Sequence, residues 1–150
     1  MVDARLLVKL LESLREQVDV IRPLQKLSLR ELTDEPLRWN GLLHLLQVSV
    51  EHATDIGAHV LAGTDQETPD SHRLIFIKLG QTKILPLEFA ERIAPMASFR
   101  NIVVHHYLSL DPEKVADILY HHLSDFDEFS FHIHDYLRRE GYITDETQDE

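Results

Sequence analysis

A chain of 150 residues is long enough to form one domain around a single sizeable core. It contains no cysteine, which excludes disulfides, thiolate zinc sites and cysteine nucleophiles. The 15 Lys plus Arg stand against 26 Asp plus Glu and give a formal net charge of -11. Any contact with nucleic acid must therefore depend on a few locally placed cations rather than on a broadly basic face.

The chain shows no signal-peptide pattern in its first residues and no run of about eighteen apolar residues. We therefore expect a soluble, cytoplasmic protein that does not use a membrane. The absence of cysteine fits a reducing compartment. Residues 144–150 are acidic and polar, and we expect a disordered tail there. Residues 1–143 then form one domain.

Helical spacing of apolar residues dominates the first 62 residues. It predicts a first helix over 3–27, with a kink at Pro23. Ser28 and Glu31 have the spacing of a capping box. A second long helix is predicted over 34–62.

Shorter elements follow a loop at 63–70. A helix is predicted over 71–79, although Ile75-Phe-Ile77 also fits a short strand. Another helix begins at Pro86 and is interrupted by Pro95. The last helix is predicted from Asp111 to Glu140. Together these elements predict an all-α antiparallel bundle of about five helices.

The segment 98–107 gathers an arginine, an amide, two histidines and a tyrosine, which suit metal-free cleavage of RNA. RNA supplies its own nucleophile, the 2′-hydroxyl. Histidine commonly acts as a general acid or base, and His105 can take that role. Arg100 can bind the phosphate through two hydrogen bonds and offset developing charge. Asn101 can hold substrate or fix an imidazole, while Tyr107 can contact phosphate or stack on a base.

On an ideal helix, Arg100 and Tyr107 share nearly one face, and Asn101 shares a neighbouring face with His105. Arg100 and His105 are then about 140° apart around the axis. One straight helix therefore does not easily point both at one phosphate. Either the chain bends between them, or two copies supply complementary halves.

Residues 100–107 carry an Arg-x4-His-x-Tyr motif that resembles the motif of HepT-type HEPN toxins. The resemblance includes the segment 51–57, the approach Met96-Ala-Ser-Phe-Arg-Asn101 and the order of helices over most of residues 3–138. Motif, length and helical pattern together are more specific than the motif alone.

The resemblance implies a helical, metal-independent endoribonuclease without a cofactor, dimerised so that two motifs face one cleft. It assigns phosphate binding to Arg100, acid–base catalysis to His105 and a polar supporting role to Asn101. In HepT systems the antitoxin is a minimal nucleotidyltransferase that transfers AMP from ATP to the motif tyrosine, which is Tyr107 here. The attached AMP would add charge and bulk where substrate phosphate binds. The implied partners are RNA, a second copy and this antitoxin.

Glu51, Asp55 and His59 are spaced to form one stripe on the second long helix. They can line the cleft and orient Arg100 or His105, or they can form a solvated helix face. Both interpretations remain open. A metal site is a weaker interpretation, because it rests on spacing alone.

Two histidine pairs, His121-His122 and His132-x-His134, also invite a metal-binding interpretation. Adjacent histidines on a helix point about 100° apart, which disfavours chelation by neighbours. We interpret all four as mostly surface or interface residues.

A different class of function also fits the acidic composition. The chain can be a non-catalytic helical subunit that presents nucleotide or substrate to a nucleotidyltransferase partner. Substitution of His105 separates the two hypotheses, because only a nuclease loses RNA cleavage when that side chain is removed.

Overall fold

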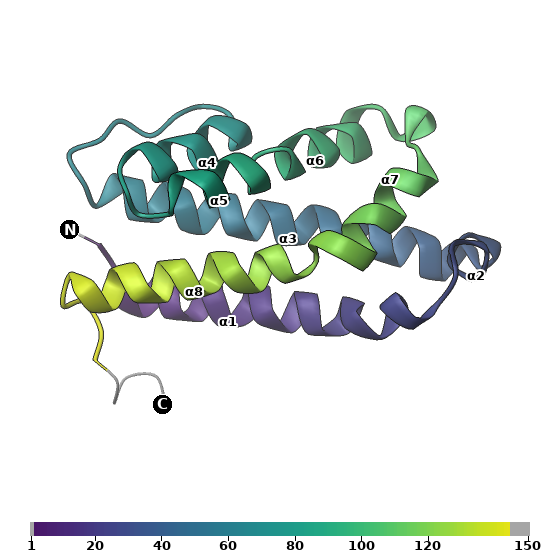
Figure 1. The fold of residues 1–150 in the computed structure, drawn as a ribbon, viewed down its shortest axis with the longest axis horizontal. Coiled ribbons are helices and arrows are strands. Elements are labelled where there is room, and N and C mark those ends of the chain that lie inside the picture. Colours follow the sequence, from purple (N-terminus) through teal and green to yellow (C-terminus); the bar gives the residue numbers. More distant parts are fainter. Residues whose placement is uncertain (1, 145–150) are drawn as a thin grey trace.

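The computed structural model describes residues 2–144, and these contain helices and connecting segments but no strand. The all-helical prediction is confirmed, and the helices form a bundle (Figure 1). The interpretation of residues 75–77 as a strand is wrong, because they lie inside helix α4. Of the predicted acidic tail, residues 145–150 lie outside the described residues.

Three long helices form the base of the bundle. They are α1 (Ala4–Ile21), α3 (Pro36–Ala62) and α8 (Ser124–Arg139). Helix α1 runs opposite to both α3 and α8 and packs against each of them (Figure 1). Its apolar side chains recur at helical spacing and are buried in the core: Leu7, Leu11, Leu14, Val18 and Ile21.

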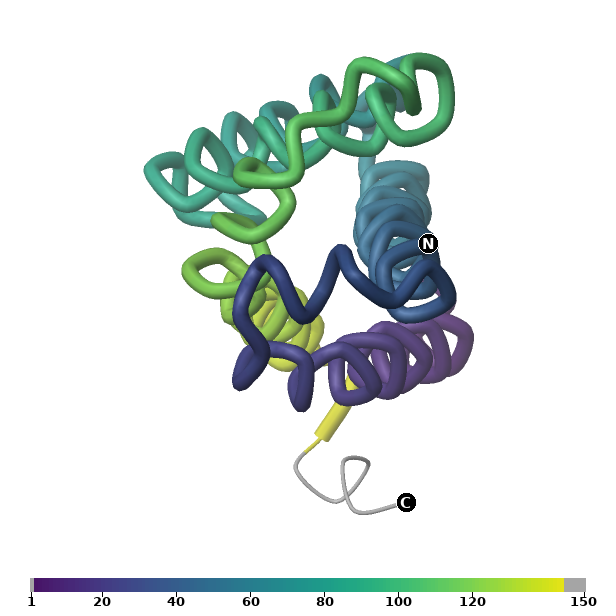
Figure 2. The backbone as a smooth tube through the Cα atoms, turned by 90° about the vertical axis from the view of Figure 1, so that its right-hand side faces the viewer, coloured from purple at the N-terminus to yellow at the C-terminus, as the bar shows by residue number. Residues whose placement is uncertain are grey.

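A second layer of shorter helices covers one side of α3, as the end view shows (Figure 2). It contains α4 (His72–Gln81), α5 (Leu87–Ile93) and α6 (Met96–His105). Phe76 of α4 meets Phe129 of α8 edge to face, with ring centroids 6.0 Å apart, and ties this layer to the base.

The crossing of α4 over α3 is close because α3 carries a glycine there. A Cβ placed on Gly57 would lie 2.8 Å from side-chain atoms of both Ile75 and Leu79. Any larger residue would push α4 away from α3. The glycine therefore sets how near the first turn of α4 comes to the polar residues of α3.

The first predicted helix is shorter than expected. Helix α1 ends at Ile21, and Pro23 lies in a 3-10 turn, Arg22–Lys26. The predicted capping box is present: Ser28 Oγ accepts the Glu31 amide at 3.1 Å, and Glu31 accepts the Ser28 amide at 3.2 Å. It begins a separate short helix, α2 (Leu29–Asp34).

The second long helix starts two residues later than predicted, at Pro36. The side chain of Glu35 accepts hydrogen bonds from the amides of Leu37 and Arg38 at 3.0 and 2.7 Å. These contacts cap the new helix and separate it from α2.

The helix predicted from Asp111 to Glu140 is divided into three parts. Helix α7 (Pro112–Asp117) passes into a π-helical turn, Ile118–His122, and then into α8. The wider turn changes the side-chain register between α7 and α8. No described helix is long and apolar enough to cross a membrane.

Candidate functional site

The guanidinium of Arg100 is held from two sides on the surface of α3. Its Nε donates to Glu51 Oε1 at 2.9 Å, and its Nη1 donates to Asn101 Oδ1 at 3.1 Å. Gln47 Nε2 donates to the same Glu51 oxygen at 3.2 Å. The side chains of Arg100 and Glu51 are only 21% and 33% exposed. This partly shielded pair fixes the plane of the guanidinium.

The contacts of Arg100 leave part of its hydrogen-bonding capacity for a ligand. An arginine has five N–H donors, and these two bonds use one on Nε and one on Nη1. The remaining donors lie on Nη1 and Nη2, the edge that binds phosphate with two parallel hydrogen bonds. The guanidinium of Arg100 is therefore oriented by Glu51 and Asn101, and it can still bind a phosphate.

Tyr107 contacts α3 at a different place. Helix α6 ends at His105, and Tyr107 begins a 3-10 turn, Tyr107–Ser109. Its hydroxyl donates to Asn40 Oδ1 at 2.7 Å, while Asn40 Nδ2 donates to the carbonyl of Pro36 at 2.8 Å. The phenol is 48% exposed, so its hydroxyl is positioned and accessible.

Arg100 and Tyr107 do not meet within one copy. Their partners on α3, Glu51 and Asn40, are eleven residues apart, or about 16 Å at about 1.5 Å per residue. The chain does bend, but after His105 and not between Arg100 and His105. The ideal-helix arrangement of Arg100 and Tyr107 therefore does not apply, because Tyr107 lies outside α6.

A polar stripe on α3 connects these two contact points. At about 100° per residue, four of its residues fall within a sector of about 60°. They are Asn40, His44, Gln47 and Glu51. Of these four, only Glu51 was predicted as a site residue, although the spacing of i, i+4, i+7 and i+11 indicates the whole stripe.

Among the remaining predicted site residues, Asp55 lines the same pocket as Arg100 and Glu51, whereas His105 and His59 do not. His105 is exposed at the last position of α6. Asp55 is exposed and lies 3.8 Å from His59, also exposed, as an i,i+4 pair. Of the predicted stripe, Glu51 orients Arg100, while Asp55 and His59 pair with each other on the surface of α3.

Another histidine, missed in the sequence, shares a pocket with Arg100. The pocket has a volume of about 500 Å³ and is lined by Glu51, Thr54, His72 and Arg100 among others. His72 Nδ1 lies 2.7 Å from Thr54 Oγ1. Burial lowers the pKa of His72, Arg100 lowers it further, and Glu51 opposes both effects. This imidazole is therefore neutral at neutral pH.

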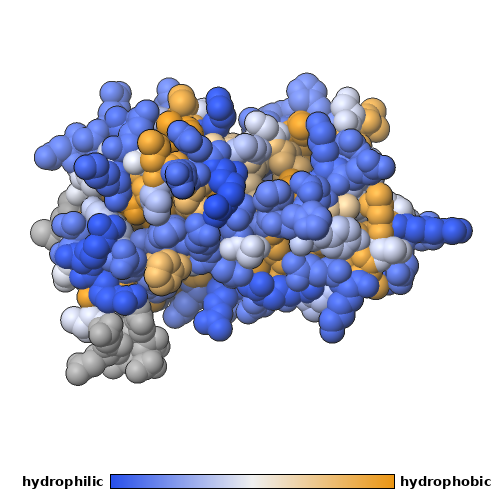
Figure 3. All heavy atoms as spheres, in the orientation of Figure 1, coloured by the Kyte–Doolittle hydropathy of each residue, from blue (hydrophilic) through white to orange (hydrophobic). Residues whose placement is uncertain are grey.

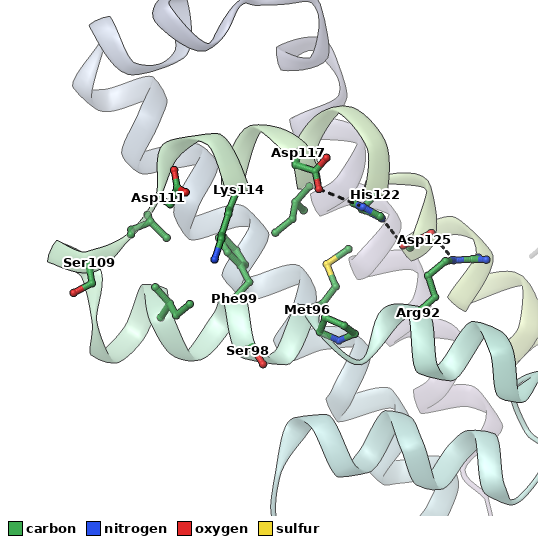
Figure 4. Close-up of a pocket in the computed structure, with 14 residues that line it drawn as sticks. Arg92, Met96, Ser98, Phe99, Ser109, Asp111, Lys114, Asp117, His122 and Asp125 are labelled. Atoms are coloured by element: carbon green, nitrogen blue, oxygen red, sulfur yellow. Dashed lines mark hydrogen bonds and ion pairs between the residues drawn. The ribbon is translucent and has the colours of Figure 1, made fainter.

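A second cavity, also of about 500 Å³, lies on another side of α6 (Figure 4). Its wall includes the buried carboxylate of Asp125, which lies 3.5 Å from Arg92 Nε and 3.2 Å from His122 Nδ1. His122 also lies 3.5 Å from Asp117. None of the motif residues 100, 101, 105 and 107 lines this cavity. These ion pairs join α5, the π turn and α8.

The other histidines also have structural surroundings. His132 lies 3.2 Å from Glu128 and packs on the ring of Phe89. His134 is half-buried, and its Nδ1 is buried without a hydrogen-bond partner in the described structure. The described residues contain no group of three His, Cys, Asp or Glu placed to hold a metal ion.

The distribution of hydrophilic and hydrophobic residues on the surface is relevant to the kind of partner the protein can contact. The face in Figure 3 is mainly hydrophilic, with small separate hydrophobic patches. Near the motif, Val104 and Leu108 are exposed, Leu108 by 97%. Such apolar side chains at the edge of a polar site suit contact with another protein chain.

The sequence model of the family described as "Ribonuclease HepT-like" matches residues 13–133, which is most of the chain and includes both α3 and the motif. This chain belongs to the HepT-like family. The resemblance proposed from residues 100–107 is thereby confirmed.

Named relatives agree with this HepT-like assignment. The chain is 28% identical over 127 residues to the tRNA nuclease HepT of Aphanizomenon flos-aquae, covering 85% of this chain and 86% of the relative. It is 32% identical over 84 residues to the mRNA nuclease HepT of Shewanella oneidensis, covering 56% of this chain and 63% of that relative.

The fold of the chain is also similar to that of a solved HEPN toxin. The chain superposes with a TM-score of 0.80 on the tri-AMPylated HEPN toxin of Shewanella oneidensis, whose structure was solved in complex with MNT antitoxin. The two are 23% identical, and the match covers 90% of this chain and 99% of that one. The HEPN-like helical bundle is therefore confirmed.

Proposed function

We propose that this HepT-like chain is a metal-independent endoribonuclease toxin that cleaves RNA through Arg100, Asn101 and His105. The observation that carries the proposal is the oriented guanidinium of Arg100, fixed by Glu51 and Asn101 with its outer edge free. Its relatives HepT of Aphanizomenon and Shewanella are nucleases of tRNA and mRNA.

In this mechanism Arg100 binds a phosphate of the RNA and offsets the charge that grows on its oxygens during attack. The 2′-hydroxyl attacks that phosphorus, so no metal-bound water is needed. His105, exposed at the end of α6, exchanges protons with a reacting oxygen. Asn101 keeps the guanidinium in place through its Oδ1.

A homodimer completes the proposed site. Arg100 and Tyr107 reach α3 about 16 Å apart in one copy. Two copies that pack around the motif would bring His105 and Tyr107 of each towards Arg100 of the other. The exposed Val104 and Leu108 at this edge supply apolar surface for such contact.

We further propose that a nucleotidyltransferase antitoxin neutralises the toxin by AMPylation of Tyr107. The hydroxyl oxygen would bond to the α-phosphorus of ATP, and pyrophosphate would leave. The hydroxyl is accessible and already held by Asn40. The attached phosphate adds negative charge and bulk at the RNA-binding edge, which opposes substrate binding without refolding.

The proposal is tested by inducing the wild type and His105→Ala without any partner, and by following growth and RNA integrity in extracts treated with a chelator. We expect arrest and RNA fragments from the wild type alone. His121→Ala, at an exposed histidine outside the motif, is the matched control and should behave as wild type. Intact RNA with folded wild type would instead support the non-catalytic nucleotidyltransferase subunit.

A further inference from the structure

His72 occupies a defined place beside the proposed site. It is the first residue of α4, and its imidazole faces α3, where Nδ1 lies 2.7 Å from the hydroxyl of buried Thr54. Gly57 allows this approach of the two helices. The imidazole, Arg100 and Glu51 line one pocket of about 500 Å³.

The hydrogen bonds of Thr54 favour one tautomer of His72. The threonine hydroxyl has one proton and lies 3.1 Å from the carbonyl of Val50 and 3.2 Å from that of Glu51. Carbonyls only accept, so the arrangement that satisfies one of them has the hydroxyl donating to it and accepting from His72. Nδ1–H of His72 then donates to Thr54 Oγ1, which leaves a free lone pair on Nε2.

The surroundings keep this imidazole uncharged and able to accept a proton. The charged and titratable groups around the pocket are Glu51, His52 and Asp55 of α3 and Arg100 of α6. Burial lowers the pKa of His72, and the cationic Arg100 adds to this effect. A neutral histidine with a free Nε2 is a base and not a second phosphate-binding cation.

The order of contacts along α3 places His72 on one side of Arg100, away from the C-terminal end of α6. His72 contacts α3 at Thr54 and Arg100 contacts it at Glu51, while α6 continues from there towards the other end of α3. Displacement at phosphorus requires the attacking and leaving oxygens on opposite sides. A phosphate held by Arg100 would therefore have His72 on one side, and its leaving oxygen would face the other side, towards which the proposed homodimer brings His105 of the second copy.

We propose that His72 is the general base of the cleavage reaction, with Nε2 accepting the proton of the ribose 2′-hydroxyl beside the phosphate bound by Arg100. This role rests on the proposed ribonuclease function. As the proton passes to Nε2, the 2′-oxygen bonds to phosphorus and the bond from phosphorus to the 5′-oxygen breaks. His105 of the second copy gives that oxygen its proton. The products are a 2′,3′-cyclic phosphate and a 5′-hydroxyl.

The test compares wild type, His72→Ala, His72→Asn and His121→Ala on a single-stranded RNA, with the fold checked by circular dichroism. We expect kcat of both His72 variants to fall by about 10²- to 10⁴-fold with little change in KM. The rise of kcat with pH, which requires a deprotonated base, should disappear. Added imidazole should restore activity to His72→Ala, a rescue that a structural role would not give.

A second variant tests the tautomer separately. Thr54→Val keeps the shape of the buried side chain but removes the acceptor for Nδ1–H. We expect kcat to fall less than in His72→Ala, with KM again unchanged. Wild-type kcat and pH profile in folded His72→Ala would overturn the role of His72 alone. Absence of cleavage by wild type would overturn the proposed function and this role together.

Discussion

The carboxylate of Glu51 lies 2.9 Å from the guanidinium of Arg100, so the arginine of the motif is already paired before any phosphate arrives. The pair has two opposing effects. It fixes the direction of the guanidinium, and it neutralises part of the positive charge that would attract RNA. In a chain with net charge -11, we expect this balance to restrict the proposed binding to RNA that fits the site.

Glu51→Gln separates orientation from charge. The amide oxygen can still accept from Arg100 Nε, but the negative charge is gone. We expect this variant to bind RNA more tightly than the wild type. We also expect the plot of log K against log salt concentration to become steeper by about 0.7, which is the contribution of one more phosphate contact on single-stranded RNA. Fluorescence anisotropy with labelled RNA measures the affinity and its salt dependence, in a His105→Ala background that prevents cleavage.

Glu51→Ala is the comparison, because it removes orientation and charge together. Its kcat should fall below that of Glu51→Gln, since the guanidinium is free to move. Weaker RNA binding by Glu51→Gln than by wild type would contradict the idea that the carboxylate competes with phosphate.

The long helices and the motif could be predicted from local patterns. Leu7, Leu11, Leu14 and Val18 repeat at helical spacing and are buried as that spacing requires. The capping box at Ser28 could also be predicted, because it depends on residues only three apart in the sequence. What such patterns could not show is that the box caps a separate helix, because the break depends on the side chain of Glu35.

The contacts that build the site could not be predicted, because they join residues distant in the chain. Tyr107 meets Asn40, Arg100 meets Glu51, and His72 meets Thr54 only after α4 and α6 pack on α3. The π turn at residues 118–122 also could not be predicted from local sequence. Its sequence suits an ordinary helix, and tertiary packing decides its shape.

Tyr107→Phe tests the regulatory half of the proposal. The substitution removes the hydroxyl that would receive AMP and the hydrogen bond to Asn40, while the ring remains. We expect RNA cleavage close to that of wild type, because His105 and Arg100 are untouched. We expect the nucleotidyltransferase partner to fail to restore growth. Mass spectrometry of co-expressed protein should find AMP on wild type and none on the variant.

The ion pairs around Asp125 predict a cost in stability rather than in catalysis. Asp125 is 6% exposed and holds both Arg92 and His122. Asp125→Ala removes one of the two acidic partners of Arg92 and of His122, which keep Glu128 and Asp117, and we expect a loss of about 1–3 kcal/mol in the free energy of unfolding by urea. Asp135→Asn is the control. Its pair with Arg139, at 3.1 Å, is exposed and should contribute at most about 1 kcal/mol.

His134 predicts how stability changes with pH. Burial lowers its pKa below the ordinary 6.5, Arg138 adds to this effect, and Glu12 opposes it. The unfolded chain therefore binds a proton more readily than the folded one, so stability is lost as the pH falls below about 6.5 and is retained above it. Urea unfolding at pH 7.5 and pH 5 measures the difference.

His134→Leu should reduce that loss, because it removes the titrating ring and its buried Nδ1, which has no hydrogen-bond partner in the described structure. Some pH dependence should remain, since the pKa of His72 is lowered in the same direction. His121→Gln, at an exposed histidine, should keep the wild-type slope. An equal slope in His134→Leu and wild type would show that His134 is not the group that titrates.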